Sequence, residues 1–152
     1  MTLPSKTQIY QTIHTQWSGL YDPQVPWYSN LSNACALLYK NLKPWWVGFY
    51  IIEGNNLHLV PFQGPVACTT IPKGKGVCGT AWQKEKSIVV PNVHLFPGHI
   101  ACSEVSNSEI VVPIFIDNKI WGVLDIDSAN FDTFDATDAL ELEKFCASLT
   151  NK

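Results

Sequence analysis

Five cysteines are the residues of this chain best suited to chemistry: Cys35, Cys68, Cys78, Cys102 and Cys146. Their number is odd, and the N-terminal residues Met1 to Lys6 lack the charged-then-apolar layout of a secretion signal. We therefore expect a cytoplasmic protein, in a compartment where thiols are kept reduced. A framework of structural disulfides is not expected there, so these cysteines are core residues, metal ligands or reactive thiols.

The positions of the cysteines separate them into two groups. Cys35 and Cys146 lie on the apolar sides of predicted helices, where a free cysteine is usually a buried core residue. Cys68, Cys78 and Cys102 lie in or beside glycine-rich loops, where helix or strand packing does not explain them. They are candidate reactive thiols, and the alternative is that they are half-buried loop residues. A nearby His99 or a short helix start would lower the pKa of the Cys102 thiol.

These three cysteines, together with His94 and His99, also raise the question of zinc. Structural zinc sites usually contain closely spaced ligand pairs, such as two cysteines separated by two to four residues. Cys68 and Cys78 are ten positions apart, and no such pair is present. The spacing argues against a structural metal, and we expect no metal and no bound cofactor.

Carboxylates form a second candidate site. Asp125 and Asp127 alternate along an apolar predicted strand, so their side chains point to the same face, and Glu109 begins the preceding strand. Buried carboxylates are unfavourable unless a cation pairs with them. They therefore mark either a strand end that becomes polar as it leaves the core, or an acidic cluster that holds an ammonium group or supplies a proton.

The register of these two strands decides between the alternatives. Asn118 tolerates the left-handed conformation that closes a three-residue loop, so we predict a loop at 116–118. This loop pairs Glu109 with Asp125 and places all three carboxylates on one face. A two-residue loop at 117–118 would place Glu109 on the opposite face, because a shift of one residue inverts every side chain of a strand.

Trp46, Gly48 and Tyr50 share one face of the first predicted strand by alternation. A glycine between two large rings leaves a gap. Either a helix packs closely against it, or Trp46 and Tyr50 form the walls of a small pocket.

The remaining pattern predicts the elements that position these residues. Helices are expected at 7–20, 27–42, 77–86 and 135–150, strands at 45–53, 57–62, 87–90, 109–115 and 119–127, and a long irregular segment at 91–108. Tight turns between neighbouring strands imply antiparallel pairing, and helices at both chain ends imply that they cover one face. The prediction is an α+β fold, with one domain spanning residues 1–152.

Composition excludes several classes of protein. Hydrophobic residues make up 46% of the 152 residues and charged residues 15%, which excludes a disordered chain. Thirteen acidic residues against ten basic ones give a net charge of -3, which argues against a nucleic-acid partner. No apolar run approaches the roughly 18 residues of a membrane span. The oligomeric state is left open, a homodimer included.

Five motifs in order resemble one family: Gly64-Pro65-Val66-Ala67-Cys68, Gly76-Val77-Cys78-Gly79-Thr80-Ala81, Pro97-Gly98-His99-Ile100-Ala101-Cys102, Ser108-Glu109-Ile110-Val111-Val112-Pro113 and Leu124-Asp125-Ile126-Asp127-Ser128. Together they resemble the free methionine-(R)-sulfoxide reductases, which are built on a GAF domain. The likeness runs from about Trp45 to Asp127. It implies a GAF-like antiparallel sheet, and an enzyme that reduces the free amino acid L-methionine (R)-sulfoxide rather than methionine sulfoxide within proteins.

The resemblance also implies roles for individual residues. They are Cys102 as the nucleophile, Cys68 as its disulfide partner, Cys78 as an auxiliary thiol, Trp46 and Tyr50 as pocket walls, and Glu109, Asp125 and Asp127 as the substrate-binding acids. The cycle would pass through a sulfenic acid on Cys102 and a disulfide that a thioredoxin-type reductant reopens. Thr70, Lys73 and Ser103 depart from the pattern expected of the family. The alternatives are a non-catalytic GAF module that binds a small effector, and a thiol redox sensor.

Overall fold

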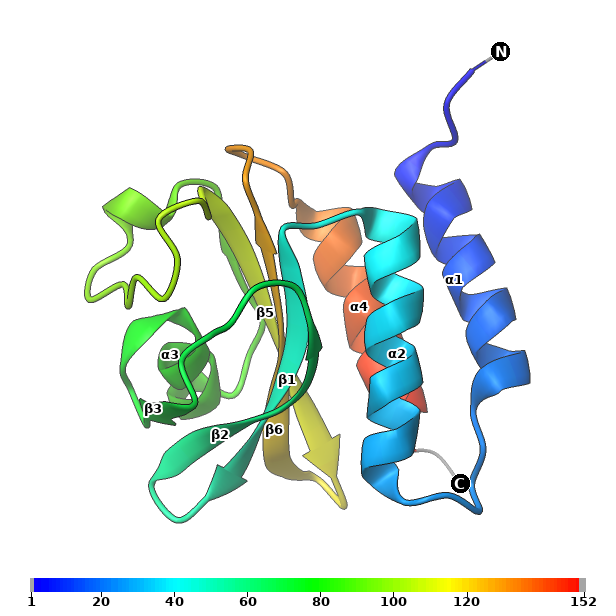
Figure 1. Cartoon of the computed structure of the whole chain (residues 1–152), viewed down its shortest axis with the longest axis horizontal. Helices are drawn as coiled ribbons and strands as arrows, with labels where there is room; N and C mark the ends of the chain where they lie inside the picture. Colours follow the sequence, from blue (N-terminus) through cyan, green and yellow to red (C-terminus); the bar gives the residue numbers. More distant parts are fainter. Residues whose placement is uncertain (1, 151–152) are drawn as a thin grey trace.

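The computed structural model describes residues 2–150, in which a sheet separates two layers of helix and loop (Figure 1). The helices are α1 (Lys6–Leu20), α2 (Trp27–Leu42), α3 (Gly76–Lys84) and α4 (Ala136–Ser148), with a 3-10 turn, η1, at Val93–Leu95. The strands are β1 (Trp46–Glu53), β2 (Asn56–Gln63), β3 (Thr70–Pro72), β4 (Ile88–Val90), β5 (Ser108–Ile116) and β6 (Lys119–Ser128). The predicted α+β class is confirmed, and β3 is the strand that the sequence pattern did not predict.

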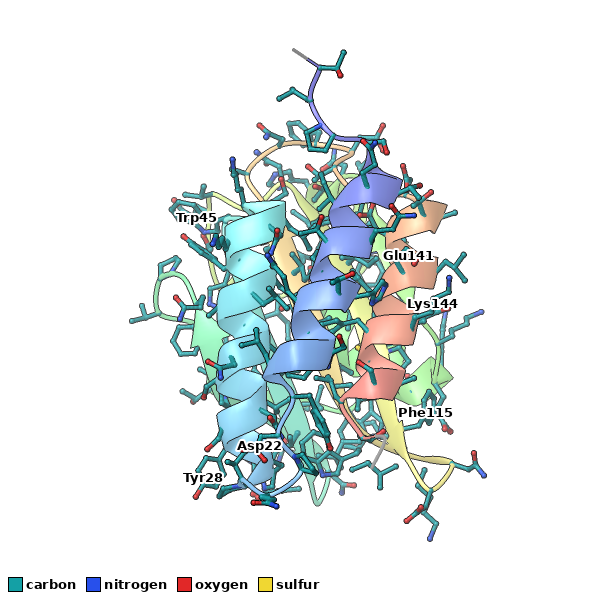
Figure 2. The ribbon with its side chains drawn as sticks, turned by 90° about the vertical axis from the view of Figure 1, so that its right-hand side faces the viewer. Asp22, Tyr28, Trp45, Phe115, Glu141 and Lys144 are labelled. Atoms are coloured by element: carbon teal, nitrogen blue, oxygen red, sulfur yellow. A yellow bond between two sulfur atoms is a disulfide. The ribbon has the colours of Figure 1, made fainter. Side chains whose placement is uncertain are left out.

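The sheet has six strands in the order β3-β2-β1-β6-β5-β4, and the strand pairs are antiparallel. Helices from both ends of the chain cover one face, as predicted: α2 and α4 lie against the sheet and α1 packs across them (Figure 1). Figure 2 shows these three helices side by side in front of the sheet. The opposite face carries α3 and the irregular segment 91–107.

The helical layer encloses the larger apolar core. It contains Cys35 and Cys146, which are 0% and 2% exposed, so the prediction that both are core residues is confirmed. Asp135 caps α4 by accepting from the backbone N–H groups of Thr137 and Asp138. The buried Asp138 side chain accepts a hydrogen bond from the Tyr10 hydroxyl at 2.6 Å and pairs with Lys6, which ties the first and last helices together. Among the described residues, no helix is both long and apolar enough to cross a membrane.

The turn between β5 and β6 differs from the prediction. Its two central residues, Asp117 and Asn118, both have positive φ, so the loop has two residues rather than three. Counted back from this turn alone, Glu109 would pair with Ile126, but the structure places it opposite Asp127 and not, as predicted, opposite Asp125.

A bulge explains why the three acids nevertheless share a face. Near the turn Phe115 pairs with Ile120, whereas the next pair is Ile114 with Gly122, which leaves Trp121 as an extra residue in β6. This extra residue shifts the register by one and cancels the inversion that a two-residue turn would cause. The predicted face of Glu109 is right, although the predicted loop is wrong.

Candidate active site

A pocket lies on the face of the sheet opposite the three long helices. Its floor is formed by β1, β5 and β6, and its sides by α3 and two loops, 64–69 and 97–106. The three acids and three of the five cysteine positions meet at this face. The residues that line it are Trp45, Trp46, Tyr50, Pro65, Val66, Ala67, Ile71, Lys75, Gly76, Val77, Cys78, His99, Ile100, Cys102, Ser103, Ser106, Glu109, Asp125 and Asp127.

The aromatic wall depends on Gly48. A Cβ atom at this position would lie 2.4 Å from the Trp46 ring, so only glycine lets the indole fold over the strand. The Trp46 ring stacks between those of Phe62 and Tyr50, with centroid separations of 5.4 and 6.1 Å. The gap predicted at Gly48 is thus filled by Trp46 itself, and the two rings named from the sequence both line the pocket.

The Cys68–Cys102 disulfide lies at the solvent side of the pocket. The two Cα atoms are 5.6 Å apart, within the expected range for a disulfide. Cys102 is exposed and Cys68 is half-buried, whereas Glu109 and Asp125 below them are buried. Two aromatic groups of the wall fix the Cys68 loop: the Tyr50 hydroxyl donates to the Cys68 carbonyl at 2.9 Å and the Trp46 indole to the Pro65 carbonyl at 3.0 Å.

The three carboxylates form the polar part of the floor. Glu109 and Asp125 are 5% and 6% exposed, and Asp127 is half-buried. The Ser106 hydroxyl donates to Oδ1 of Asp127 at 3.4 Å. Oδ1 of Asp125 is buried and has no hydrogen-bond partner among the described residues. A cluster of this kind is set up to receive hydrogen-bond donors, above all those of a cation.

Burial and mutual repulsion change the acidity of the cluster. Burial, followed by the charge of Asp125, raises the pKa of Glu109 well above its usual value. Burial, reinforced by the neighbouring carboxylates, raises the pKa of Asp125 and that of Asp127 in the same direction. Because the three groups interact, they titrate as one unit, and the unit retains protons at a pH where isolated carboxyls have lost them.

Cys78 lies in the first full turn of α3, and its side chain reaches the same cluster. Its sulfur and carboxylate oxygens of Glu109 and Asp125 all lie within 4.8 Å of one another, close enough to hold a metal ion together. Burial, followed by the charge of Asp125, raises the pKa of the Cys78 thiol well above its usual value. Its predicted role as an auxiliary thiol stays a prediction, and its position makes it equally a wall of the acid pocket.

Three lining residues carry polar contacts that the sequence argument did not assign. Nε2 of His99 lies 3.9 Å from Oε1 of Glu109, and burial lowers the pKa of this imidazole. The sequence associated His99 with Cys102 instead. His94 lies outside this set, since its Nε2 contacts the Asn107 side chain at 2.9 Å. Ser106 and Trp45 were not identified, because neither belongs to a motif and both reach the pocket only through tertiary packing.

The unpartnered Asp125 leads to a stability prediction. The raised pKa of Asp125 means that the folded protein binds more protons than the unfolded chain, so stability falls as pH rises from about 4 through the raised value. Asp125→Asn removes the contribution of Asp125 to this dependence and supplies amide donors to the other carboxyls. We expect it to raise the free energy of unfolding by about 1–3 kcal/mol near pH 7, and by less near pH 5.

Urea unfolding of the wild type and the variant at the two pH values measures this effect. Glu53→Gln is a matched control, because Glu53 is an exposed carboxylate at the end of β1. It should change stability by no more than about 0.5 kcal/mol. A less stable Asp125→Asn protein would mean that the buried acid is compensated in the folded state.

Comparison with known proteins places this fold and pocket in a family. The profile of the GAF domain matches residues 8–151. The free methionine-R-sulfoxide reductase of Escherichia coli strain K12 is 43% identical over 95% of this chain and 88% of its own length. The enzyme of the same name from Saccharomyces cerevisiae is 46% identical over 97% of this chain and 87% of its own length.

Comparison with solved structures gives the same result as comparison of the sequences. The free methionine-R-sulfoxide reductase of Neisseria meningitidis, determined in complex with its substrate, superposes with a TM-score of 0.94 at 43% identity and covers 99% of this chain and 91% of its own. The chain therefore belongs to the GAF-domain proteins and, among them, to the free methionine-R-sulfoxide reductase family.

Proposed function

We propose that this protein is a thiol-dependent reductase of free L-methionine (R)-sulfoxide. The observation that carries the proposal is the single pocket that combines a solvent-facing cysteine, an aromatic wall and a buried acidic cluster. The acids accept the α-ammonium of a free amino acid, with Oδ1 of Asp125 as the unpaired acceptor. The Trp46 ring packs against the S-methyl end. Residues of a protein chain lack this ammonium, so the pocket selects the free amino acid.

Reduction begins at Cys102. Its thiolate attacks the sulfoxide sulfur and forms an S–S bond, while an acid protonates the sulfoxide oxygen, which leaves as water when the S–O bond breaks. A water molecule then attacks the Cys102 sulfur, and the S–S bond breaks to release methionine. Glu109 and Asp127 are the candidate donors, because burial raises the pKa of each and keeps a proton on the cluster at a pH where isolated carboxyls have lost theirs. In the net reaction, one thiol and one sulfoxide are converted to one sulfenic acid and one methionine. The two-electron oxidation passes to Cys102, and the oxygen of its sulfenic acid comes from water.

Cys68 then closes the cycle. Its thiol condenses with the sulfenic acid to give the Cys68–Cys102 disulfide and one water. The Cα separation of 5.6 Å in the disulfide form supports this pairing. An external dithiol of the thioredoxin type restores both thiols by exchange, and the cytoplasm is the compartment that keeps such dithiols reduced. No bound cofactor takes part in any step.

The lining of the pocket helps to decide whether the protein is instead a non-catalytic GAF module that binds a small effector. Nucleotides and other phosphate ligands need cations or exposed N–H groups, whereas this floor presents three carboxylates. The floor therefore favours a ligand with a positive end. A free amino acid fits this requirement and an anionic effector does not.

A coupled assay tests the proposed function. Thioredoxin, thioredoxin reductase and NADPH are mixed with the protein and with the separated R and S epimers of free methionine sulfoxide. We expect NADPH oxidation with the R epimer and at least about 100-fold less with the S epimer, because only one arrangement places oxygen beside the acids when the ammonium and methyl group are bound. Absence of turnover with both epimers would refute the proposal.

A further inference from the structure

The segment that carries Cys102 has few attachments to the rest of the protein. This Cys102 segment, residues 97–105, contains no helix or strand. Its backbone bonds are local: His99 N–H to the Phe96 carbonyl at 3.2 Å and Cys102 N–H to the Ile100 carbonyl at 3.1 Å. Ile100 packs against Gly76 and the neighbouring apolar cluster. In the disulfide form the bond to Cys68 supplies a further, covalent attachment.

One hydrogen bond joins the Cys102 segment to a distant part of the chain. The indole Nε1 of Trp45 donates to Oγ of Ser103 at 3.2 Å. Within residues 2–150, it is the one hydrogen bond from this segment to anything beyond its immediate neighbours in sequence. The Ser103 hydroxyl also accepts the Val105 N–H at 3.2 Å, so it fixes the local turn and the indole at the same time.

Trp45 is itself held by β6, the strand that carries Asp125 and Asp127. It precedes β1, and its backbone N–H donates to the Asp127 carbonyl at 2.8 Å. Figure 2 shows it at the edge of the helical layer, beside the end of α2. Strand alternation from Trp46 would direct Trp45 toward the helices, yet it lines the pocket. A single residue thus connects the backbone that carries the acids to the residue that follows Cys102.

We propose that Trp45 is a positioning residue, which holds Cys102 over the acidic floor through its hydrogen bond to Ser103. This contact matters most in the reduced protein, where the disulfide no longer restrains the Cys102 segment. It orders the segment before the thiolate reacts, and orders it again before the sulfenic acid meets Cys68. The inference rests on the proposed function, since it takes Cys102 as the reacting residue.

A double-mutant cycle in a Cys68→Ser background tests the proposal. This background isolates the first turnover from disulfide closure. Trp45→Phe keeps a ring and removes the N–H donor, Ser103→Ala removes the acceptor, and the third variant combines both. Each single change should slow the first-turnover formation of methionine at saturating substrate by about 2- to 13-fold, the net worth of one hydrogen bond. KM should stay within about 2-fold.

The cycle distinguishes a direct contact from independent effects. The double variant should be no slower than the slower single variant, because the second change removes a bond that is already lost. Ser103→Thr keeps the hydroxyl and should restore the rate to within about 2-fold. Three results would each overturn the proposal. The rate reductions of the two single variants could multiply in the double variant, KM could rise while the first-turnover rate is unchanged, or both single variants could keep the parent rate.

A second measurement separates this inference from the proposed function. In the chain with all its cysteines, the equilibrium constant for forming the Cys68–Cys102 disulfide against a reference dithiol requires no substrate. Trp45→Phe and Ser103→Ala should each lower it by about 2- to 13-fold, because closure must then order a looser segment. If the Cys68→Ser parent forms no methionine while this constant still falls, the proposed function fails and the positioning role stands. An unchanged constant contradicts the positioning role.

Discussion

Cys102→Ser will yield no methionine from free methionine (R)-sulfoxide, even in a single turnover. The substitution removes the exposed thiol to which we assign the attack on sulfur, and it leaves Cys68 in place. A serine hydroxyl is not ionised near neutral pH and cannot accept the oxidising equivalent. Loss of the nucleophile should lower the rate by at least about 10⁴-fold. Quenched-flow quantification of methionine provides the measurement.

Cys68→Ser separates attack from resolution. It should release about one methionine per protein and then stall, because the sulfenic acid has lost its partner. Cys78 is a poor substitute, since burial raises the pKa of its thiol and leaves little thiolate. Cys35→Ser and Cys146→Ser are matched controls within the core and should leave the cycle intact. Normal single turnover by Cys102→Ser would remove Cys102 from the reaction.

N-Acetyl methionine sulfoxide should be a much poorer substrate than the free amino acid. Acetylation replaces the ammonium with a neutral amide and leaves the buried acids without their cation. We expect kcat/KM to fall by at least about 100-fold, which corresponds to about 2.7 kcal/mol. The comparison uses the (R)-sulfoxide of each compound in the same coupled assay.

A variant of the acid cluster provides the control. Asp125→Asn lowers the negative charge of the floor. It should bring the kcat/KM values for the two substrates closer together, mainly because kcat/KM for the free amino acid falls. Equal kcat/KM values for the two substrates in the wild type would show that the carboxylates do not recognise the ammonium. The acids would then need another function.

Much of the fold was predictable because local patterns dominate it. The apolar spacing of residues 27–42 predicts α2 with the bounds that the structure gives. The helix predicted at 135–150 is likewise present as α4, with Asp135 as its N-cap. The strand β3 was missed, because three residues are too few to establish an alternating pattern, and they form a strand only by pairing with β2.

The face of Glu109 was predicted correctly through an incorrect loop. A two-residue turn and the bulge at Trp121 cancel each other, and the turn argument considered only the first of them. Gly122 carried a signal, since an isolated glycine in a strand often marks a bulge or a close backbone approach. A Cβ there would lie 2.4 Å from the Tyr50 carbonyl oxygen.

Contacts between distant segments could not be predicted in the same way. The sequence identified eight candidate site residues from loop position, alternation and motif. Seven of them line the pocket, and the eighth, Cys68, is bonded to the lining residue Cys102. The contacts of Trp45 with Ser103 and of His99 with Glu109 depend on how the irregular segment 91–107 folds back over the sheet. No periodicity or spacing encodes that path.

The most direct test uses the fully reduced protein without any external reductant. One equivalent of free methionine (R)-sulfoxide is added, methionine is counted, and peptide mapping by mass spectrometry locates the cysteines that are oxidised. The proposed cycle predicts about one methionine per protein, with the Cys68–Cys102 disulfide formed in the same proportion and with Cys35, Cys78 and Cys146 still reduced. Methionine formed without this disulfide, or no methionine at all, would contradict it.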